Sequence, residues 1–336
     1  MKIQRVPRQS RTSAHRGAAA ALTALCLGAG SLATAATAQA APAPDETSTK
    51  ASASADTKYP VGDLGTVVHN HLFSPNAVAG ANDWTCKPSA KHPYPVVLSH
   101  GAGANMGANW AALAPRLANE GYCVYAFNYG MHALSLGRSG GMTDIGESAK
   151  SMSAFVDRVL ASTDAKKVDV VGHSEGGMMP NYYIKRLGGG AKVHTLVGMA
   201  PSNHGTTLSG LVTLFKGLNG LGLVNNFLDF AGLAGLKQQE VESDFQKELW
   251  KDGDTVRGVN YVVIQTKHDT VVTPHTNSFL RGDNVTNILL QDQCPDNSVG
   301  HMGVALDGPT LENIENVLGP NDPDFKPVCA NYGPAV

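Results

Sequence analysis

The sequence has few charged and few aromatic residues for its length. Asp, Glu, Lys and Arg together make up 16% of the 336 residues, and Phe, Trp and Tyr make up 6%. Without the five basic side chains of residues 1–40, the rest of the chain carries 21 basic and 28 acidic groups, a net charge of −7. An acidic chain is repelled by the phosphate backbone, so nucleic-acid binding is not a predicted function.

Long apolar runs are missing beyond the N-terminal region, and a membrane-spanning helix needs about 20 apolar residues. The N-terminal region itself follows the pattern of a secretory signal peptide. A basic start is followed by the apolar, alanine-rich stretch 17–32 and by the cleavage pattern Ala-Gln-Ala at 38–40. We therefore predict a signal peptide over residues 1–40, no transmembrane segment, and a secreted, extracellular protein.

The next stretch is of low complexity. Ala, Pro, Ser and Thr dominate residues 41–58, and such a composition cannot bury enough apolar surface to fold. We expect a disordered linker there and a single folded domain over 59–336.

Cysteine is scarce, with five in the chain, and no two of them are spaced as in Cys-x-x-Cys, which argues against a zinc site. Beyond Cys26, which lies in the predicted signal peptide, four remain: Cys86, Cys123, Cys294 and Cys329. An even number in an exported protein predicts two disulfides. Four cysteines allow three pairings; we favour Cys86–Cys123 and Cys294–Cys329, because the two loops closed are local and similar in length.

The rest of the chain is organised around residues 168–176. The apolar run Val168–Val171 predicts a buried strand, and the letters GHSEG that follow fit the pattern G-x-S-x-G. Small residues flanking Ser174 permit a sharp strand-to-helix turn that exposes its hydroxyl. The start of the following helix provides free amides and a partial positive charge beside the serine. Ser174 is therefore the candidate nucleophile.

Apolar runs and helical periodicity alternate along the chain. Helices are predicted over 109–119, after a capping-box-like pair at Asp144 and Glu147, and after Ser174. Strands are expected at 95–99, 122–127, 168–171, 195–198, 261–264 and 285–290. This alternation predicts an α/β fold: a mostly parallel, doubly wound sheet with helices on both faces.

The first strand runs into His100-Gly101-Ala102-Gly103, which resembles the oxyanion loop of α/β-hydrolases. In that loop, the residue after His-Gly donates its backbone amide to the oxyanion. The predicted donors are therefore the amides of Ala102 and Glu175. We expect His100 to brace the loop rather than to do chemistry.

A serine hydroxyl needs a base that is oriented by an acid. Asp269 follows the buried strand 261–264 and is the candidate acid; Asp283 and Asp292 are weaker alternatives. His301 lies in a loop of small residues after the last strand and is the candidate base, with His268 and His275 as alternatives.

Residues 208–250 are rich in Leu, Phe and Gly, with few charges before residue 237. Two interpretations are open. The segment forms ordinary buried helices, or it is an apolar lid or cap inserted above the strand ends that shelters a cleft.

These motifs together resemble the secreted bacterial lipases of the class 2 (triacylglycerol lipase) group of the α/β-hydrolase superfamily. The matching pieces are HGAG at 100–103 with Asn109-Trp110, GHSEGG at 172–177, NHGTT at 203–207, KHDTVVTP at 267–274, and Gly300-His301. One departure is Glu175, where many relatives have Gln. The amide alone serves the oxyanion, but a carboxylate beside the serine is expected to disfavour anionic substrates.

The resemblance implies the α/β-hydrolase fold and a secreted serine hydrolase that acts on lipid esters, most readily triacylglycerols, at a lipid–water interface. A short-chain esterase, or a polyester or amide hydrolase, would use the same triad, and a non-catalytic binding protein on this scaffold is a third hypothesis. No cofactor is expected. Some lipases hold a structural calcium ion, but the chain has no EF-hand-like acidic loop for one.

Overall fold

The computed structural model of the protein describes residues 58–220 and 233–336, which belong to one compact unit. The predicted signal peptide over 1–40 and the predicted linker, apart from its last residue, lie outside the described residues. So does the stretch 221–232 of the apolar segment. These expectations remain predictions.

A six-stranded parallel sheet, in the spatial order β2-β1-β3-β4-β5-β6, forms the centre of this unit. The strands are β1 (Val96–Ser99), β2 (Val124–Phe127), β3 (Val168–His173), β4 (Val193–Met199), β5 (Asn260–Gln265) and β6 (Val285–Leu289). All six predicted strands are present within two residues of their expected ends. The predicted doubly wound α/β architecture is thus confirmed.

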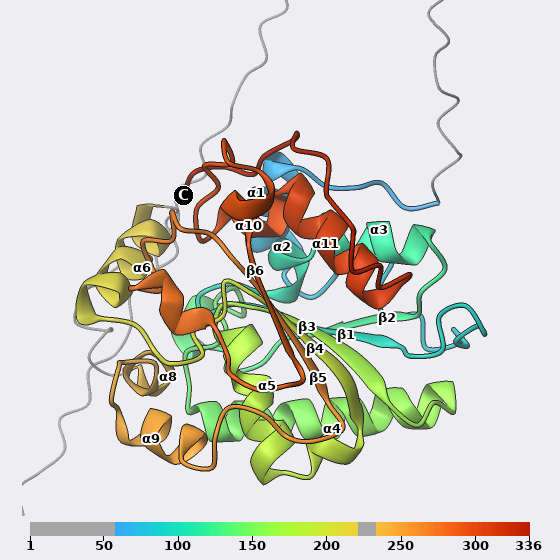
Figure 1. Cartoon of the computed structure of the whole chain (residues 1–336), viewed down its shortest axis with the longest axis horizontal. Helices are drawn as coiled ribbons and strands as arrows, with labels where there is room; N and C mark the ends of the chain where they lie inside the picture. The colour runs from blue at the N-terminus through green and yellow to red at the C-terminus, as the bar shows by residue number, and fades with distance from the viewer. Residues whose placement is uncertain (1–57, 221–232) are drawn as a thin grey trace, which may run out of the picture. The chain divides into compact units, whose positions relative to one another are not determined.

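Helices cover both faces of the sheet (Figure 1). The α-helices are α1 (Leu64–Phe73), α2 (Met106–Asn109), α3 (Leu113–Asn119), α4 (Ile145–Thr163), α5 (Glu175–Arg186), α6 (Leu208–Gly220), α8 (Ala234–Gln238), α9 (Asp244–Trp250), α10 (Leu290–Gln293) and α11 (Gly308–Leu318). Short 3-10 helices are η1 (Ala133–Ser135), η2 (Gly189–Ala191), η3 (His275–Ser278) and η4 (Gly303–Leu306). In the part of the chain that the structure describes, none of the helices is both long and apolar enough to cross a membrane.

Alternate side chains of the buried strands point to two separate cores. On β1, Val96 and Leu98 pack with α3 and α11, whereas Val97 packs with α4 and α5. Both faces of the central strands are therefore covered by helices, as a parallel sheet requires.

One predicted helix differs from the structure. The expected helix over 109–119 is split into α2 and α3, with a break at residues 110–112. Asn105 caps α2 by accepting a hydrogen bond from the Ala108 amide at 3.0 Å. The carbonyl of Ala111 accepts a hydrogen bond from the Gly62 amide, 2.9 Å away. This partner comes from a distant segment, which the local helical spacing does not indicate.

The apolar segment 208–250 contains α6, α8 and α9 in its described parts. Its last helix packs against the main core. Leu249 of α9 is fully buried in the core that contains α4 and α5, and Phe245 stacks on Tyr182 of α5 at 5.6 Å between ring centroids. This packing agrees with the interpretation of ordinary buried helices at this end of the segment, and a lid or cap role for 208–250 stays a prediction.

Two disulfides join Cys86 to Cys123 and Cys294 to Cys329, with sequence separations of 37 and 35 residues. These are the local pairs that the sequence favours. The first ties the loop before β1 to the residue preceding β2, far along the chain from Ser174. The second ties the end of α10 to the segment 329–336.

We predict that replacing Cys86 and Cys123 together by Ala lowers the free energy of unfolding by about 3–4 kcal/mol, because a bridge of this span restricts the unfolded chain. Urea denaturation of the oxidised wild type and of the double variant measures the difference. A loss below about 1 kcal/mol would contradict the prediction.

Candidate active site

The candidate site lies where the order of the strands reverses. The chain passes from β1 to β2 on one side and then returns to place β3 on the other side of β1. In open α/β sheets, the carboxyl ends of the strands flank a crevice at this point. The loop after β1 carries Ala102, and Ser174 follows β3 directly, so these two residues lie on either side of the switch point.

Two positions that flank Ser174, Gly172 and Gly176, have room only for glycine. A Cβ atom on Gly172 would lie 1.9 Å from the carbonyl oxygen of Gly176, and one on Gly176 would lie 2.1 Å from that of Ser99. Ser174 has φ of 54° and ψ of −123°, which is strained for a residue with a side chain. The sequence signal G-x-S-x-G thus reflects close packing of three backbone segments.

Helix α5 begins directly after Ser174 and contains Pro180. Proline has no amide hydrogen, so the carbonyl of Gly176, four residues earlier, lacks its usual helical donor. The hydroxyl of Ser99 donates to that carbonyl at 2.6 Å instead. This bond ties the end of β1 to the first turn of α5 and keeps the helix N-terminus beside Ser174.

Three side chains from distant segments form a continuous chain of hydrogen bonds at the strand ends. His301 Nε2 lies 2.9 Å from Ser174 Oγ, and His301 Nδ1 lies 2.8 Å from Asp269 Oδ2. All three residues are buried. The structure thus brings together the serine, histidine and aspartate that were selected from the sequence.

Asp269 is held by more than His301. Its Oδ1 accepts hydrogen bonds from the amides of Val271 and Val272, both at 2.8 Å. Burial by itself raises the pKa of Asp269, but the charge interaction and hydrogen bond with His301, with the two amides, lower the pKa below its usual value. The carboxylate is therefore ionised and oriented toward His301 Nδ1.

The alternative residues lie elsewhere. His268, Asp283 and Asp292 are exposed, and His275 lies in η3, where its carbonyl accepts a hydrogen bond from Gln265. None of the four is hydrogen-bonded to Ser174 or His301 within the described residues.

The amides of Ala102 and Glu175 donate no hydrogen bond inside residues 58–220 and 233–336. The loop that carries Ala102 is held by two hydrogen bonds with Gly140: Gly103 N donates to the Gly140 carbonyl, and Gly140 N donates to the Ala104 carbonyl, each at 2.7 Å. The two free amides are available for an oxyanion, which is the role predicted for them.

His100 is fully buried and braces this loop, as expected. Its Nδ1 donates to the Gly101 carbonyl at 2.9 Å, and its ring stacks on Tyr129 with 4.4 Å between centroids. Burial lowers the pKa of His100 to about 4, so the ring is neutral.

His173 and Asn109 also position the site, although neither is among the residues for which the sequence predicts a role. His173 Nε2 donates to the backbone carbonyl of His301 at 2.9 Å, and Asn109 Oδ1 accepts from the Gly101 amide at 2.9 Å. Burial lowers the pKa of His173 to about 3. The sequence signal that could have identified these two residues is their place within the motifs around Ser174 and Ala102.

The segment 329–336 packs against the loop of His301. Met302 N donates to the Val336 carbonyl at 2.7 Å, and Gly300 N donates to the Pro334 carbonyl at 3.1 Å. A Cβ atom on Gly303 would lie 1.9 Å from the Pro334 carbonyl oxygen. Nothing in the local sequence of this segment indicates this contact with the candidate base.

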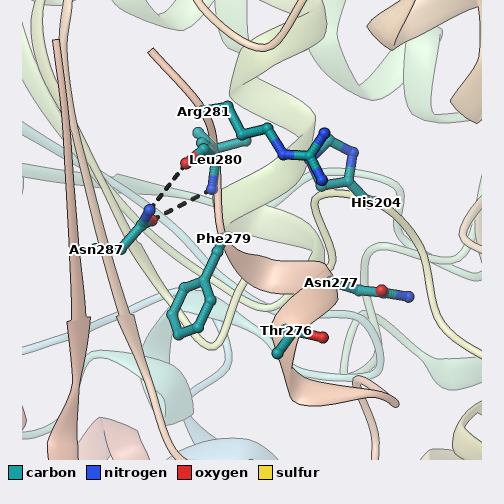
Figure 2. Close-up of a pocket in the computed structure, with 7 residues that line it drawn as sticks. All are labelled: His204, Thr276, Asn277, Phe279, Leu280, Arg281 and Asn287. Carbon is teal, nitrogen blue, oxygen red and sulfur yellow. Dashed lines mark hydrogen bonds between the residues drawn. The ribbon is translucent and has the colours of Figure 1, made fainter. Parts of the chain in front are cut away.

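A separate surface pocket of about 490 Å³ opens beside η3 (Figure 2). Its lining residues are His204, Thr276, Asn277, Phe279, Leu280, Arg281 and Asn287. Asn287 is fixed by two hydrogen bonds with the backbone of Leu280, and His204 Nε2 lies 3.3 Å from Asp254 Oδ2. Ser174, Asp269 and His301 do not line this pocket.

The described ranges hold no group of three or more His, Cys, Asp or Glu side chains that could bind a metal ion. The expectation that no cofactor is needed stays a prediction.

Known proteins resemble this chain in sequence and in structure. The profile of the family described as "Lipase (class 2)" matches residues 93–308. A triacylglycerol lipase of Pseudarthrobacter phenanthrenivorans is 36% identical over 96 residues, or 26% of this chain and 27% of that protein. One of Burkholderia plantarii is 36% identical over 96 residues, or 26% of this chain and 24% of that protein. The aligned region spans about a quarter of these relatives.

Two solved structures share the fold. Lipase B of Aspergillus fumigatus aligns with a TM-score of 0.55 and 19% identity, covering 71% of this chain and 57% of that chain. The mature lipase BlEst2 of Bacillus licheniformis aligns with a TM-score of 0.50 and 14% identity, covering 69% of this chain and 94% of that chain.

We predict that the Cys294–Cys329 disulfide, which tethers the segment 329–336, matters for the reactivity of Ser174 and that the other disulfide does not. Replacing Cys294 and Cys329 by Ala removes the covalent tether of the segment 329–336. Labelling of Ser174 by a fluorophosphonate should then slow about 10- to 100-fold, because a small displacement of the base His301 lowers the reaction rate strongly. The Cys86/Cys123 double variant is the matched control. Equal labelling rates in the two variants would show that the segment does not position His301.

Proposed function

The chain belongs to the class 2 lipase family, and we propose that it is a secreted serine hydrolase that cleaves carboxylic esters through Ser174, His301 and Asp269. The observation that carries this proposal is the continuous relay from Ser174 Oγ to His301 Nε2 and from His301 Nδ1 to Asp269 Oδ2. A nucleophile, a base and an orienting acid in this arrangement are what acyl transfer requires.

In the proposed reaction, Ser174 Oγ attacks the ester carbonyl while His301 Nε2 takes the hydroxyl proton. The ionised Asp269 keeps the proton of His301 on Nδ1 and stabilises the imidazolium that forms. The amides of Ala102 and Glu175 stabilise the oxyanion. His301 then protonates the leaving alcohol, and water, activated by the same histidine, releases the acyl group from Ser174.

An apolar cluster beside these residues supports acyl chains as substrates. Its buried members are Ala102, Met142, Leu214, Leu233, Leu236 and Val271, with Met302 packed against them. The cluster joins α6 and α8 to the loops that carry Ala102, Asp269 and His301. An alkyl chain that reached this buried cluster would be shielded from water, which favours lipid esters such as triacylglycerols at a lipid–water interface.

Rival functions use the same residues. A short-chain esterase, or a polyester or amide hydrolase, requires the same hydrogen-bonded triad. It differs only in which substrate fits the site. The third hypothesis, a binding protein without activity, is disfavoured because such a protein has no need for a complete hydrogen-bonded relay. Export from the cell is supported by the two disulfides and by the predicted signal peptide.

We predict that Ser174→Ala lowers kcat for p-nitrophenyl butyrate by about 10⁶-fold and that Asp269→Asn lowers it by about 10⁴-fold. Ser151→Ala, at an exposed position of α4, and His268→Ala, at the exposed alternative base, should retain activity. Steady-state kinetics of the purified variants provides the test. Persistent activity in Ser174→Ala would assign the nucleophile elsewhere.

A series of p-nitrophenyl esters from acetate to palmitate tests the substrate class. The apolar cluster predicts a higher kcat/KM for long chains than for acetate. A preference for acetate, with Ser174→Ala inactive, would retain the triad and change the assignment to a short-chain esterase. No hydrolysis of any ester, together with no fluorophosphonate labelling, would favour the hypothesis of a non-catalytic binding protein.

A further inference from the structure

The side chain of Glu175 is not directed at a substrate. Glu175 follows the proposed nucleophile directly, and the sequence suggested that its carboxylate would repel anionic substrates. In the structure the residue is 0% exposed, and its Oε2 accepts a hydrogen bond from Gln239 Nε2 at 2.6 Å. The carboxyl group is therefore part of the packing between α5 and the end of α8, which no motif in the sequence indicates.

The direction of this hydrogen bond follows from a third group. Gln239 Nε2 also lies 3.2 Å from the carbonyl of Gly235, which can only accept, and Gln239 Oε1 accepts from the Ser202 hydroxyl at 2.8 Å. The amide of Gln239 therefore presents its nitrogen to Glu175. Oε2 of Glu175 is an acceptor, and any proton on this carboxyl group resides on Oε1.

The surroundings of Oε1 favour the protonated form. Oε1 is buried and accepts no hydrogen bond within the described residues. The neighbouring ionisable side chain is Tyr129, whose own hydroxyl hydrogen is donated to the His100 carbonyl at 2.5 Å. No Lys, Arg or His side chain of the described ranges forms an ion pair with Glu175. Burial raises the pKa of Glu175 well above its usual range, against a smaller lowering by Tyr129.

The same carboxyl group lies close to the support of the oxyanion loop. A Cβ atom on Gly141 would lie 3.1 Å from Glu175 Oε1 and 2.8 Å from the Cα of Ala102. The preceding residue, Gly140, exchanges two backbone hydrogen bonds with the loop of Ala102. Movement of the Glu175 carboxyl group would therefore be transmitted to the amide of Ala102 through residues 140–141.

Its other contact reaches α8. Gln239 follows this helix, and the neighbouring Gln238 makes an equivalent contact with a different element: its Oε1 accepts from the Ile145 amide at 2.8 Å, at the start of α4. Helix α8 is thus attached by one glutamine to the nucleophile turn and by the other to α4.

We propose that Glu175 is a positioning residue whose neutral carboxyl group holds the oxyanion loop and α8 together around Ser174, so that loss of its proton would loosen this packing and lower activity. The inference concerns a residue of the proposed active site and therefore rests on the proposed function. Ionisation would leave a buried charge with a single donor, and the structure could relieve it only by admitting water between α8 and the loop of Ala102.

The proposal predicts the sign of a pH effect on stability. A native carboxyl group that keeps its proton, against an unfolded one that loses it near pH 4.3, binds more protons in the native state. The stability of the native protein is then greatest at or below about pH 4.3 and falls as the pH rises toward the native pKa. Glu175→Gln retains an acceptor and a donor in the same places but has no proton to lose.

The first experiment compares Ser174→Ala with Ser174→Ala/Glu175→Gln by thermal unfolding from pH 5 to pH 9, so that the readout does not depend on activity. The Tm of the double variant should rise relative to the single variant by about 2–4 °C per pH unit until the native carboxyl group itself ionises. Parallel Tm curves over this range would overturn the proposal, even if Ser174 is the nucleophile. Conversely, an active Ser174→Ala would refute the proposed nucleophile and leave this measurement valid.

The second experiment tests the positioning role with matched glutamines. Gln239→Leu removes the donor to Glu175, whereas Gln238→Leu removes the contact with α4 and leaves Glu175 unchanged. Fluorophosphonate labelling of Ser174 at pH 7 should slow about tenfold or more in Gln239→Leu and stay within twofold of the wild type in Gln238→Leu. Equal rates in the two variants would contradict a positioning role for the Glu175–Gln239 contact.

The third experiment compares how kcat depends on pH in Glu175→Gln and in the wild type. The ratio of kcat in Glu175→Gln to kcat in the wild type should increase with pH, by up to about tenfold per pH unit above the native pKa. A ratio independent of pH, together with parallel Tm curves, would assign Glu175 a packing role only.

Discussion

Close backbone contact between residues 172 and 176 is the constraint on which the site depends. A Cβ atom on Gly172 would clash with the carbonyl of Gly176, and a Cβ atom on Gly176 would clash with the carbonyl of Ser99. These contacts press the start of α5 against the ends of β1 and β3, so that Ser174 adopts a strained conformation at the tip of the turn. Any side chain there would separate the three segments and remove the helix N-terminus from the serine.

The surroundings of this turn contain many polar groups that are out of contact with water. His100 and His173 are held neutral by burial, whereas Asp269 is held ionised by His301 and two amides. Burial disfavours the charged form of all three groups, and for Asp269 alone the interactions with His301 and the two amides outweigh it. In such an environment each hydrogen bond is stronger than in water, and each missing partner is more costly.

Local sequence predicted the elements well and their continuity less well. The six strands were recognisable because buried parallel strands are short apolar runs. The helix expected over 109–119 is broken at residues 110–112, where the carbonyl of Ala111 accepts a hydrogen bond from the amide of Gly62, which is remote in sequence. For the segment 208–250 the sequence left buried helices and a cap open, and Leu249 of α9 is buried in the main core. Periodicity identifies an apolar face but does not identify its partner.

The residues of the relay could be selected from the sequence because strand ends of a parallel sheet meet at one edge, and because Asp269 and His301 each follow a strand along the chain. The sequence alone left His268 and His275 open; the tertiary structure places His301 at 2.9 Å from Ser174 Oγ.

The local sequence by itself determined the strands, the glycine turn and the chemistry carried by Ser174, because these depend on residues within a few positions along the chain. The tertiary structure alone decided the environment of Glu175 and the attachment of the segment 329–336 to the loop of His301. Burial and hydrogen bonding there depend on Gln239, Tyr129 and Val336, which approach from distant parts of the chain.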